Sequence, residues 1–375
     1  MKLRPPARAR EDLTRLCAGE RDIAELVDEA DELVASVVPH DGACWHTTDP
    51  ATLIETTFRT IDLPPRDERV AELEYGVPDY NKFAMLARAR QHSGVLSEAT
   101  GGQLHRSARY REIMHPVGYR GELRVSLVVD GACWGSIAVF RKAPRDFTED
   151  ERRFAHDIAP ILAQSFRSAA VRMMSTEARA DVGPGLILFD GARQVESVTT
   201  AAMVWLAELG FVGDVDTDPL PLAVSAVAER ARAVGGDATA RVRGAGGAWV
   251  AVDASAASGP TPGRIALILQ SATPTSMAPL IAAAHGLSPR ERELTELVLQ
   301  GFGTTEIAER LVISPLTVQG HLKSIFEKVG VRSRRELVST MFVRHYQPRI
   351  VAMGSPARPS VHRLPNATPT SSPGP

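Results

Sequence analysis

Polar side chains gather on one face of a helix that the sequence predicts shortly before its C-terminal end. Ser314-Pro315 is typical of a helix start and Gly330 of a helix end. On such a helix Gln319 can bond to an adenine edge, Lys323 to a phosphate or a guanine, and Leu316 to a thymine methyl group. The exposed face and its flanks therefore predict contact with duplex DNA by Leu316, Thr317, Gln319, Gly320, His321 and Lys323.

A shorter helix is predicted just before this one, at Thr304–Leu311. Two helices joined by a tight turn, the second one longer, form a helix-turn-helix, which places the second helix in the major groove. The motif spans about residues 304–323. Backbone N–H groups at the start of the shorter helix attract a phosphate, so Thr304 and Thr305 are further candidates.

Two more helices complete the segment. Ser288, Pro289 and Glu291 form a capping box with proline at the first helical position, and Gly301 ends that helix. Ser333 and Glu336 predict another capping box, where Arg332, Arg334 and Arg335 add positive charge for phosphate contact. The side chains expected inside these four helices are Leu294, Leu297, Val298, Ile307, Ala308, Leu311, Val318, Leu322, Ile325, Phe326, Val329, Leu337, Val338, Met341 and Phe342.

The segment resembles the LuxR-type DNA-binding domain over residues 287–342. The matching residues are Leu287 to Glu293, Gly301, Glu306 to Leu311, Ile313-Ser314, Thr317-Val318, His321-Leu322 and Val331 to Arg334. The resemblance implies a four-helix module that binds DNA as a dimer, its third helix reading bases and its fourth helix often forming the dimer contact. Members commonly carry a basic residue at Gln319 and a side chain at Gly320, so we expect a weaker phosphate grip or an unusual DNA site.

An alternative interpretation is a binding module of another class. In it the C-terminal bundle mainly contacts a protein partner such as RNA polymerase, and DNA binding is incidental. Strongly salt-dependent DNA affinity argues against this alternative, because phosphate contacts release counterions.

Upstream of the motif the pattern changes to short strands and longer helices. Residues 10–38 are predicted as one helix, and residues 124–141 as a hairpin that turns at Asp130-Gly131. Thr148 and Glu151 predict a capping box that opens a long helix. Further along, the predicted strands are 185–190, 195–198, 238–242, 249–254 and 265–270, with a helix at 199–210.

Residues 23–172 resemble a GAF domain. The likeness lies in the leading helix, the Leu127–Val139 hairpin and the helix start at Asp146 to Glu151. Residues 182–272 more faintly resemble a PAS domain, in Gly185 to Asp190, Ala201-Ala202 and Trp205-Leu206. Both families are sheet-plus-helix folds that bind small molecules or dimerise. The resemblance implies a sensor role and names no ligand.

The expected architecture is multidomain, with two α/β (α+β) sensor domains followed by an all-α helix-turn-helix domain. The segments are an N-terminal segment 1–22, the GAF-like domain 23–172, the PAS-like domain 182–272, a linker 273–284, the DNA-binding domain 285–345 and a disordered tail 346–375. The tail is rich in Pro, Ser and Thr.

Composition limits the remaining function classes. The formal net charge is −2, the apolar runs are too short for a membrane span, and three cysteines at wide spacing favour a reducing cytoplasm. The resemblance to the LuxR-type domain implies double-stranded DNA as the partner, bound by a homodimer. The composition favours a cytoplasmic protein without membrane contact. No nucleophile or phosphate-binding motif supports an enzyme.

Cofactor sites find little support in the sequence. No histidine pair has metal-ligand spacing, although His92, His105 and His115 could meet in the fold. Cys44 and Cys133, each beside a tryptophan, are interpreted as buried small side chains and not as redox sensors. We therefore expect neither a metal nor a cofactor, and leave open a small-molecule ligand of the GAF-like domain.

Overall fold

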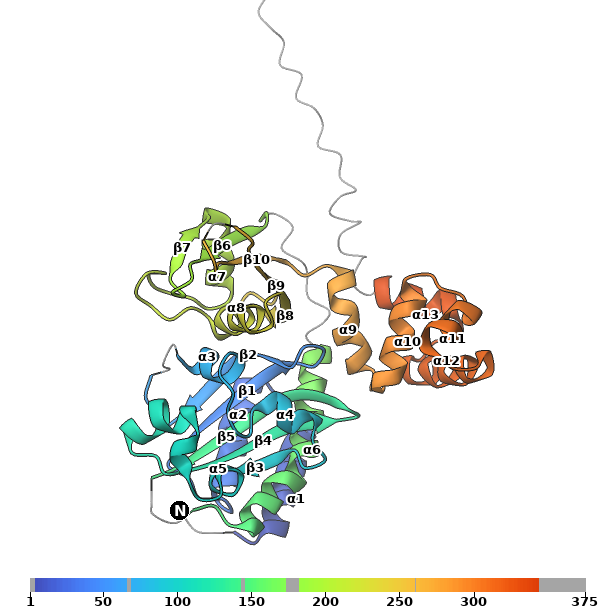
Figure 1. The fold of residues 1–375 in the computed structure, drawn as a ribbon. Coiled ribbons are helices and arrows are strands. Elements are labelled where there is room, and N and C mark those ends of the chain that lie inside the picture. The colour runs from blue at the N-terminus through green and yellow to red at the C-terminus, as the bar shows by residue number, and fades with distance from the viewer. Residues whose placement is uncertain (1–3, 66–68, 143–145, 173–181, 260, 344–375) are drawn as a thin grey trace, which may run out of the picture.

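The computed structural model describes residues 4–65, 69–142, 146–172, 182–259 and 261–343. Two sheet-containing domains are followed by a group of C-terminal helices, with helix α9 (Pro274–Ala284) between the sheets and that group (Figure 1). Helix α9 occupies the segment that we interpreted as a linker. Thr273 caps it by accepting a hydrogen bond from the Ser276 backbone N–H. The predicted tail, residues 346–375, lies outside the described residues.

The first domain is an antiparallel sheet with helices on both faces. Its strands lie in the order β2-β1-β5-β4-β3. Their bounds are β1 Gly42–Asp49, β2 Ile54–Ile61, β3 Ser93–Val95, β4 Gly121–Val129 and β5 Ala132–Arg141. The longer helices are α1 Pro6–Cys17, α2 Ile23–Ala35, α3 Arg69–Tyr75, α4 Phe83–Arg88, α5 Leu96–Thr100 and α6 Glu149–Arg172, and three short helical turns lie at Leu104–Arg106, Tyr110–Met114 and His115–Val117.

Strand parity separates the two faces of this sheet. Successive side chains of a strand point to opposite faces. Trp45 and Ile137 therefore join the apolar core with α1, α2 and α6, whereas His46 and Ser136 point to the side of α3 and α4. The predicted hairpin is confirmed, with Asp130 and Gly131 both in the left-handed region. The Thr148–Glu151 capping box is also confirmed.

The prediction of a single helix over residues 10–38 is wrong. The chain forms α1 and α2, because the Asp22 carboxylate caps a new helix by accepting a hydrogen bond from the Ala24 N–H. Helix α1 buries Ala9, Leu13 and Leu16 in the core of the first domain. The described part of the N-terminal segment is therefore packed into that domain.

The second domain has the same strand order as the first when the strands of each are numbered separately. Its antiparallel sheet runs β7-β6-β10-β9-β8. The bounds are β6 Gly185–Phe189, β7 Val195–Val198, β8 Asp237–Arg243, β9 Trp249–Ala256, β10 Ile265–Ser271, α7 Thr200–Glu208 and α8 Leu222–Val234. The predicted strands and α7 are present, whereas α8 was not predicted.

A buried ion pair joins the two sheet domains. The Asp49 carboxylate, at the end of β1, accepts hydrogen bonds from the Arg241 guanidinium at 2.8 Å and from the Arg241 backbone N–H at 2.9 Å. Both side chains are almost fully buried. At the same end of the first sheet, Arg292 donates to the Gly131 carbonyl at 3.0 Å, so the C-terminal helices contact the hairpin turn.

Two of the three histidines singled out in the sequence do meet. The rings of His105 and His115 lie 5.2 Å apart, whereas His92 stacks on His156. Among the described residues, no group of three histidine, cysteine or carboxylate side chains could hold a metal ion. Within the same residues, no helix is long and apolar enough to cross a membrane.

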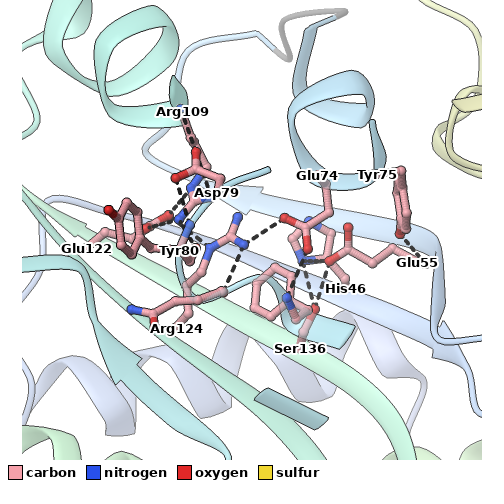
Figure 2. A network of polar contacts seen from close by, with 12 residues as sticks. His46, Glu55, Glu74, Tyr75, Asp79, Tyr80, Arg109, Glu122, Arg124 and Ser136 are labelled. Carbon is pink, nitrogen blue, oxygen red and sulfur yellow. Dashed lines mark hydrogen bonds and ion pairs between the residues drawn. The ribbon is translucent and has the colours of Figure 1, made fainter. Parts of the chain in front are cut away.

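Charged side chains fill the face of the first sheet beneath α3 and α4 (Figure 2). Arg124 donates to Glu74 at 2.7 Å and to Glu122 at 3.0 Å, and Arg109 donates to Glu122 at 2.7 Å. All four side chains are nearly fully buried. Buried charges are tolerated when they are paired and hydrogen-bonded, and this network meets both conditions.

Glu55 stands at the end of this network. Ser136 donates to its carboxyl group at 2.9 Å, and His46 Nδ1 lies 3.1 Å from the same oxygen. Burial raises the pKa of Glu55 from 4.5 to about 8, and the neighbouring Glu74 carboxylate adds to the increase. Glu55 is therefore protonated at neutral pH.

We predict that the first domain loses stability as the pH rises. A carboxyl group whose pKa is higher in the folded than in the unfolded state stabilises the fold below its ordinary pKa of 4.5, and this contribution is lost as the pH passes about 8. One such proton changes the free energy of unfolding by at most about 1.4 kcal/mol per pH unit. Glu55→Gln cannot ionise, so urea unfolding at a series of pH values should show a flatter dependence.

The matched control is Glu98→Gln, since Glu98 is half exposed and its carboxylate lies 3.9 Å from the Arg152 guanidinium. It should retain the pH dependence of the unchanged chain. An unchanged slope in Glu55→Gln would show that Glu55 is already ionised in the folded state.

Candidate DNA-binding interface

Helices α10 (Pro289–Leu299), α11 (Thr304–Leu311), α12 (Pro315–Val329) and α13 (Arg334–Val343) make up the C-terminal region. The chain passes from α11 to α12 through Val312, which has a φ of 53° and a side chain that is 88% exposed. The predicted helix-turn-helix is therefore present as α11, a tight turn and α12. The side chain of Phe342, which we expected inside, lies outside the described residues.

An apolar core fixes which side of α12 faces outward. Val318, Leu322 and Ile325 are buried at the spacing of one helical face. They pack in one core with the buried side chains Leu287, Leu294, Val298, Ile307, Ala308, Val329, Leu337 and Met341. The opposite side of α12 therefore faces away from this core.

Helix caps determine where each helix begins. Ser288 accepts from the Glu291 N–H while Glu291 accepts from the Ser288 N–H, as the predicted capping box requires. Ser314 accepts from the Thr317 N–H at 3.0 Å and starts α12. At the start of α13 the box is incomplete, because Glu336 accepts from the Arg332 N–H instead of the Ser333 N–H.

Glu291 has a second role that the sequence analysis missed. Its carboxylate is buried and accepts hydrogen bonds from Ser324 and Lys328 of α12, each at 2.7 Å. Burial raises the pKa of Glu291, but the hydrogen bonds from Lys328, Ser324 and Ser288 outweigh it and lower the pKa to about 2. One ionised side chain thus ties the start of α10 to the C-terminal half of α12.

The predicted base-reading residues form an outward stripe on α12. Leu316, Gln319, Gly320 and Lys323 are exposed, and Leu316 is 76% exposed despite its apolar side chain. Thr317 is also exposed and lies 2.8 Å from the Ser314 hydroxyl group, while His321 is half-buried at the edge of the stripe. The spacing of three and four residues places the stripe on one side of the helix.

The candidate phosphate contacts are less uniform. Thr304 and Thr305 lie at the start of α11, where the Glu306 carboxylate already accepts from the Gly303 N–H at 2.7 Å. Arg332 and Arg335 are exposed. Arg334 is half-buried and donates to the Phe302 carbonyl, so part of its guanidinium connects α13 to the loop before α11. Nothing in the local sequence signals this contact between residues 32 positions apart.

Comparison with known proteins identifies two regions of the chain. Residues 285–341 match the family described as bacterial regulatory proteins, luxR family, and residues 22–166 match the GAF domain. Over 52 residues, 14% of the chain, it is 46% identical to a protein named as an HTH-type transcriptional regulator in Mycobacterium bovis and to the oxygen regulatory protein NreC of Staphylococcus aureus. The chain spans 6% and 24% of the lengths of these relatives.

Solved structures resemble parts of the chain at a low level. One is the GAF domain of a phosphoenolpyruvate-protein phosphotransferase from Coxiella burnetii, with 14% identity, a TM-score of 0.34 and coverage of 44% of this chain and 95% of that one. The family matches are more specific than this likeness. The chain therefore carries a GAF domain followed by a helix-turn-helix domain of the luxR family of bacterial regulatory proteins.

Proposed function

We propose that the chain is a transcription regulator that binds specific DNA sites as a homodimer through α12, in the bacterial cytoplasm where the chromosome lies. The observation that carries this proposal is the outward stripe of α12, which is exposed and includes the polar side chains of Gln319 and Lys323, while the opposite face packs in the core. A helix presented in this way enters the major groove with its N-terminal end first.

In this proposal each side chain of the outward stripe contacts a different chemical group of the DNA. Gln319 bonds an adenine edge, Lys323 a guanine or a phosphate, and Leu316 a thymine methyl group. The residues that position the helix on the backbone are Thr304, Thr305, Thr317, His321, Arg332 and the N–H groups of Arg334 that do not bond to Phe302. Gly320 lets the helix backbone approach the DNA closely.

We further propose that the upstream domains control this contact. The second domain repeats the strand order of the GAF domain, which supports its interpretation as a PAS-like sensor. Helix α6 leaves the GAF domain and packs against α9, and α9 packs against α10 and α13. A change in α6 packing would therefore move the C-terminal helices relative to the GAF domain. In a dimer, this movement would change the distance between the two α12 helices.

Replacing Gln319 and Lys323 together by alanine should abolish recognition of discrete sites. Loss of one bidentate contact removes about 1–3 kcal/mol of base discrimination, and loss of one phosphate contact lowers the slope of log affinity against log salt by about one. The measurement is genome-wide DNA capture with the full-length chain, followed by binding titrations at several salt concentrations on the best site.

Gln300→Ala is the matched control, since Gln300 is exposed at the end of α10 and off the stripe. It should capture the same sites as the unchanged chain. If the double variant captured the same sites as the unchanged chain, α12 would not be the helix that reads the bases. If the unchanged chain captures no site and instead retains RNA polymerase, the protein-partner alternative is favoured.

Gly320→Ala should stabilise the C-terminal domain and weaken its DNA binding. A Cβ atom added at Gly320 meets no atom within 4 Å. Alanine is therefore sterically free there and favours the helix by about 1 kcal/mol relative to glycine. The added methyl group lies on the face that we assign to DNA, so urea unfolding and DNA affinity should change in opposite directions.

Gly330→Ala provides the contrast, because Gly330 ends α12 with a φ of 76° and alanine is strained in that conformation. It should destabilise the domain and leave the base-reading stripe unchanged. Equal DNA affinity of Gly320→Ala and the unchanged chain would place Gly320 outside the interface.

A further inference from the structure

Three side chains of the first sheet have the arrangement that activates a thiol group. Cys44 and His46 of β1 point to the same face of the sheet, and the Cys44 Sγ lies 3.1 Å from the His46 Nε2. On the other side of the ring, the His46 Nδ1 lies 3.1 Å from the Glu55 Oε1 (Figure 2). A nucleophile beside a base that a third group orients is the pattern of an activated nucleophile.

Ser136 determines which ring nitrogen of His46 carries the hydrogen. The Ser136 hydroxyl group donates its single hydrogen to Glu55 at 2.9 Å, and its oxygen lies 3.2 Å from the His46 Nδ1. This oxygen can therefore only accept from Nδ1, so the hydrogen of the neutral ring is on Nδ1. The Nε2 is then an acceptor, and it faces the Cys44 thiol as a base.

The Cys44 thiol can be reached from solvent. Cys44 is partly exposed, although its backbone is paired on both sides, with Thr60 of β2 and Ala138 of β5. The exposed surface therefore belongs mainly to the side chain. On the same face of the sheet Thr60 is exposed and Phe58 is 40% exposed. A small reagent can therefore approach the sulfur from the β2 side.

The other two cysteines have a different environment. Cys133 is buried, and burial raises the pKa of its thiol to about 12. Burial also raises the pKa of the Cys17 thiol, which a hydrogen bond with Ser165 only partly offsets. The interpretation of Cys44 and Cys133 as buried small side chains is thus confirmed for Cys133 and is wrong for Cys44, which is partly exposed and contacts a histidine.

The charged groups on this face of the sheet are compatible with a thiolate. The carboxylates of Glu74 and Glu122 are each paired with an arginine, and Glu55 is protonated at neutral pH. Arg124 lies in the same row of the sheet as Cys44, two strands away. Among these groups a thiolate would therefore meet no unpaired carboxylate. The other titratable groups on the elements around this face include Asp41, Asp62, Tyr75, Asp79, Lys82 and Tyr119.

We propose that Cys44 is a redox modification site, at which a small hydroperoxide oxidises the thiol to a sulfenic acid. The thiol proton moves to the His46 Nε2, and the thiolate attacks the terminal oxygen of the hydroperoxide. The S–O bond forms as the O–O bond breaks, and the leaving alkoxide or hydroxide takes the proton from Nε2. The sulfur loses two electrons and the hydroperoxide gains them, so the products are a sulfenic acid and an alcohol or water.

The imidazole increases the fraction of the thiol that can react. The thiolate is the nucleophile, and an ordinary cysteine with a pKa of about 8.5 is only a few per cent ionised at pH 7. A neighbouring imidazolium lowers the pKa of a thiol to about 7.5 or less. Cys44 is therefore expected to react about tenfold or more faster at pH 7 than the other two cysteines.

The test follows the three cysteines of the full-length chain separately. The chain is incubated with hydrogen peroxide or tert-butyl hydroperoxide in the presence of dimedone, which traps sulfenic acids, and mass spectrometry identifies each labelled residue. Iodoacetamide alkylation at a series of pH values gives the apparent pKa of each thiol. Cys44 should be labelled first, and its thiol pKa should lie below the ordinary value of about 8.5.

Two variants test the role of the imidazole. His46→Gln removes the base and should slow the oxidation of Cys44 by about tenfold or more, with its thiol pKa returning toward the ordinary value. Ser136→Ala removes the hydroxyl group that orients the ring and should cause a smaller loss. His156→Gln is the matched control, because His156 lies on α6 on the other face of the sheet, and it should leave Cys44 unchanged. Circular dichroism establishes that each variant is folded.

The proposal is overturned if dimedone labels Cys44 no faster than Cys17, or if folded His46→Gln keeps both the oxidation rate and the thiol pKa of the unchanged chain. The comparison of the three cysteines needs only the unchanged chain, so it decides the question even where a variant does not fold. The site involves the first domain alone, and failure of this test would leave the proposed DNA binding standing.

Discussion

The buried carboxylate of Glu291 is the interaction on which the candidate interface depends. It closes the cap of α10 and receives hydrogen bonds from Ser324 and Lys328 of α12, so the direction of the outward stripe is tied to the first helix of the domain. Its pKa of about 2 keeps it ionised in any cellular compartment. The hydrogen bonds from three donors offset the free-energy cost of burying this carboxylate. Loss of one donor would leave a partly bonded charge inside the domain.

Local signals predicted helices α10 and α12 well, because each of them begins with a side-chain cap that lies close to it in the sequence. Ser288 with Glu291, Ser314 and Gly330 act within one helical turn and are visible in the sequence. The two errors upstream, the single helix over residues 10–38 and the unpredicted helix α8, arose where such local signals were absent or hidden. The break before Asp22 was hidden by an apolar pattern that continues on both sides, and α8 begins at Leu222 with no side-chain cap.

The residues of the candidate interface could be predicted from sequence, whereas the contacts between distant positions could not. Periodicity placed Gln319 and Lys323 opposite Val318 and Leu322, because a helix repeats every 3.6 residues whatever lies upstream. The contacts that the sequence did not predict join distant positions, as in Arg334 with Phe302 and Arg124 with Glu74. Such pairs depend on the tertiary arrangement. From sequence alone, a charged residue in a strand is predicted to face solvent, because its partner is not known.

The ion pair between Asp49 and Arg241 bears on how such proteins are assembled from parts. Among the described residues, each of these charges is buried and is neutralised by the ion pair with the other domain. Grafting either sheet domain alone onto a different partner would leave one of them uncompensated in an apolar setting, where an orphaned charge typically costs about 3–5 kcal/mol. The two domains are thus expected to be inherited and exchanged together, as a single cassette in front of the helix-turn-helix.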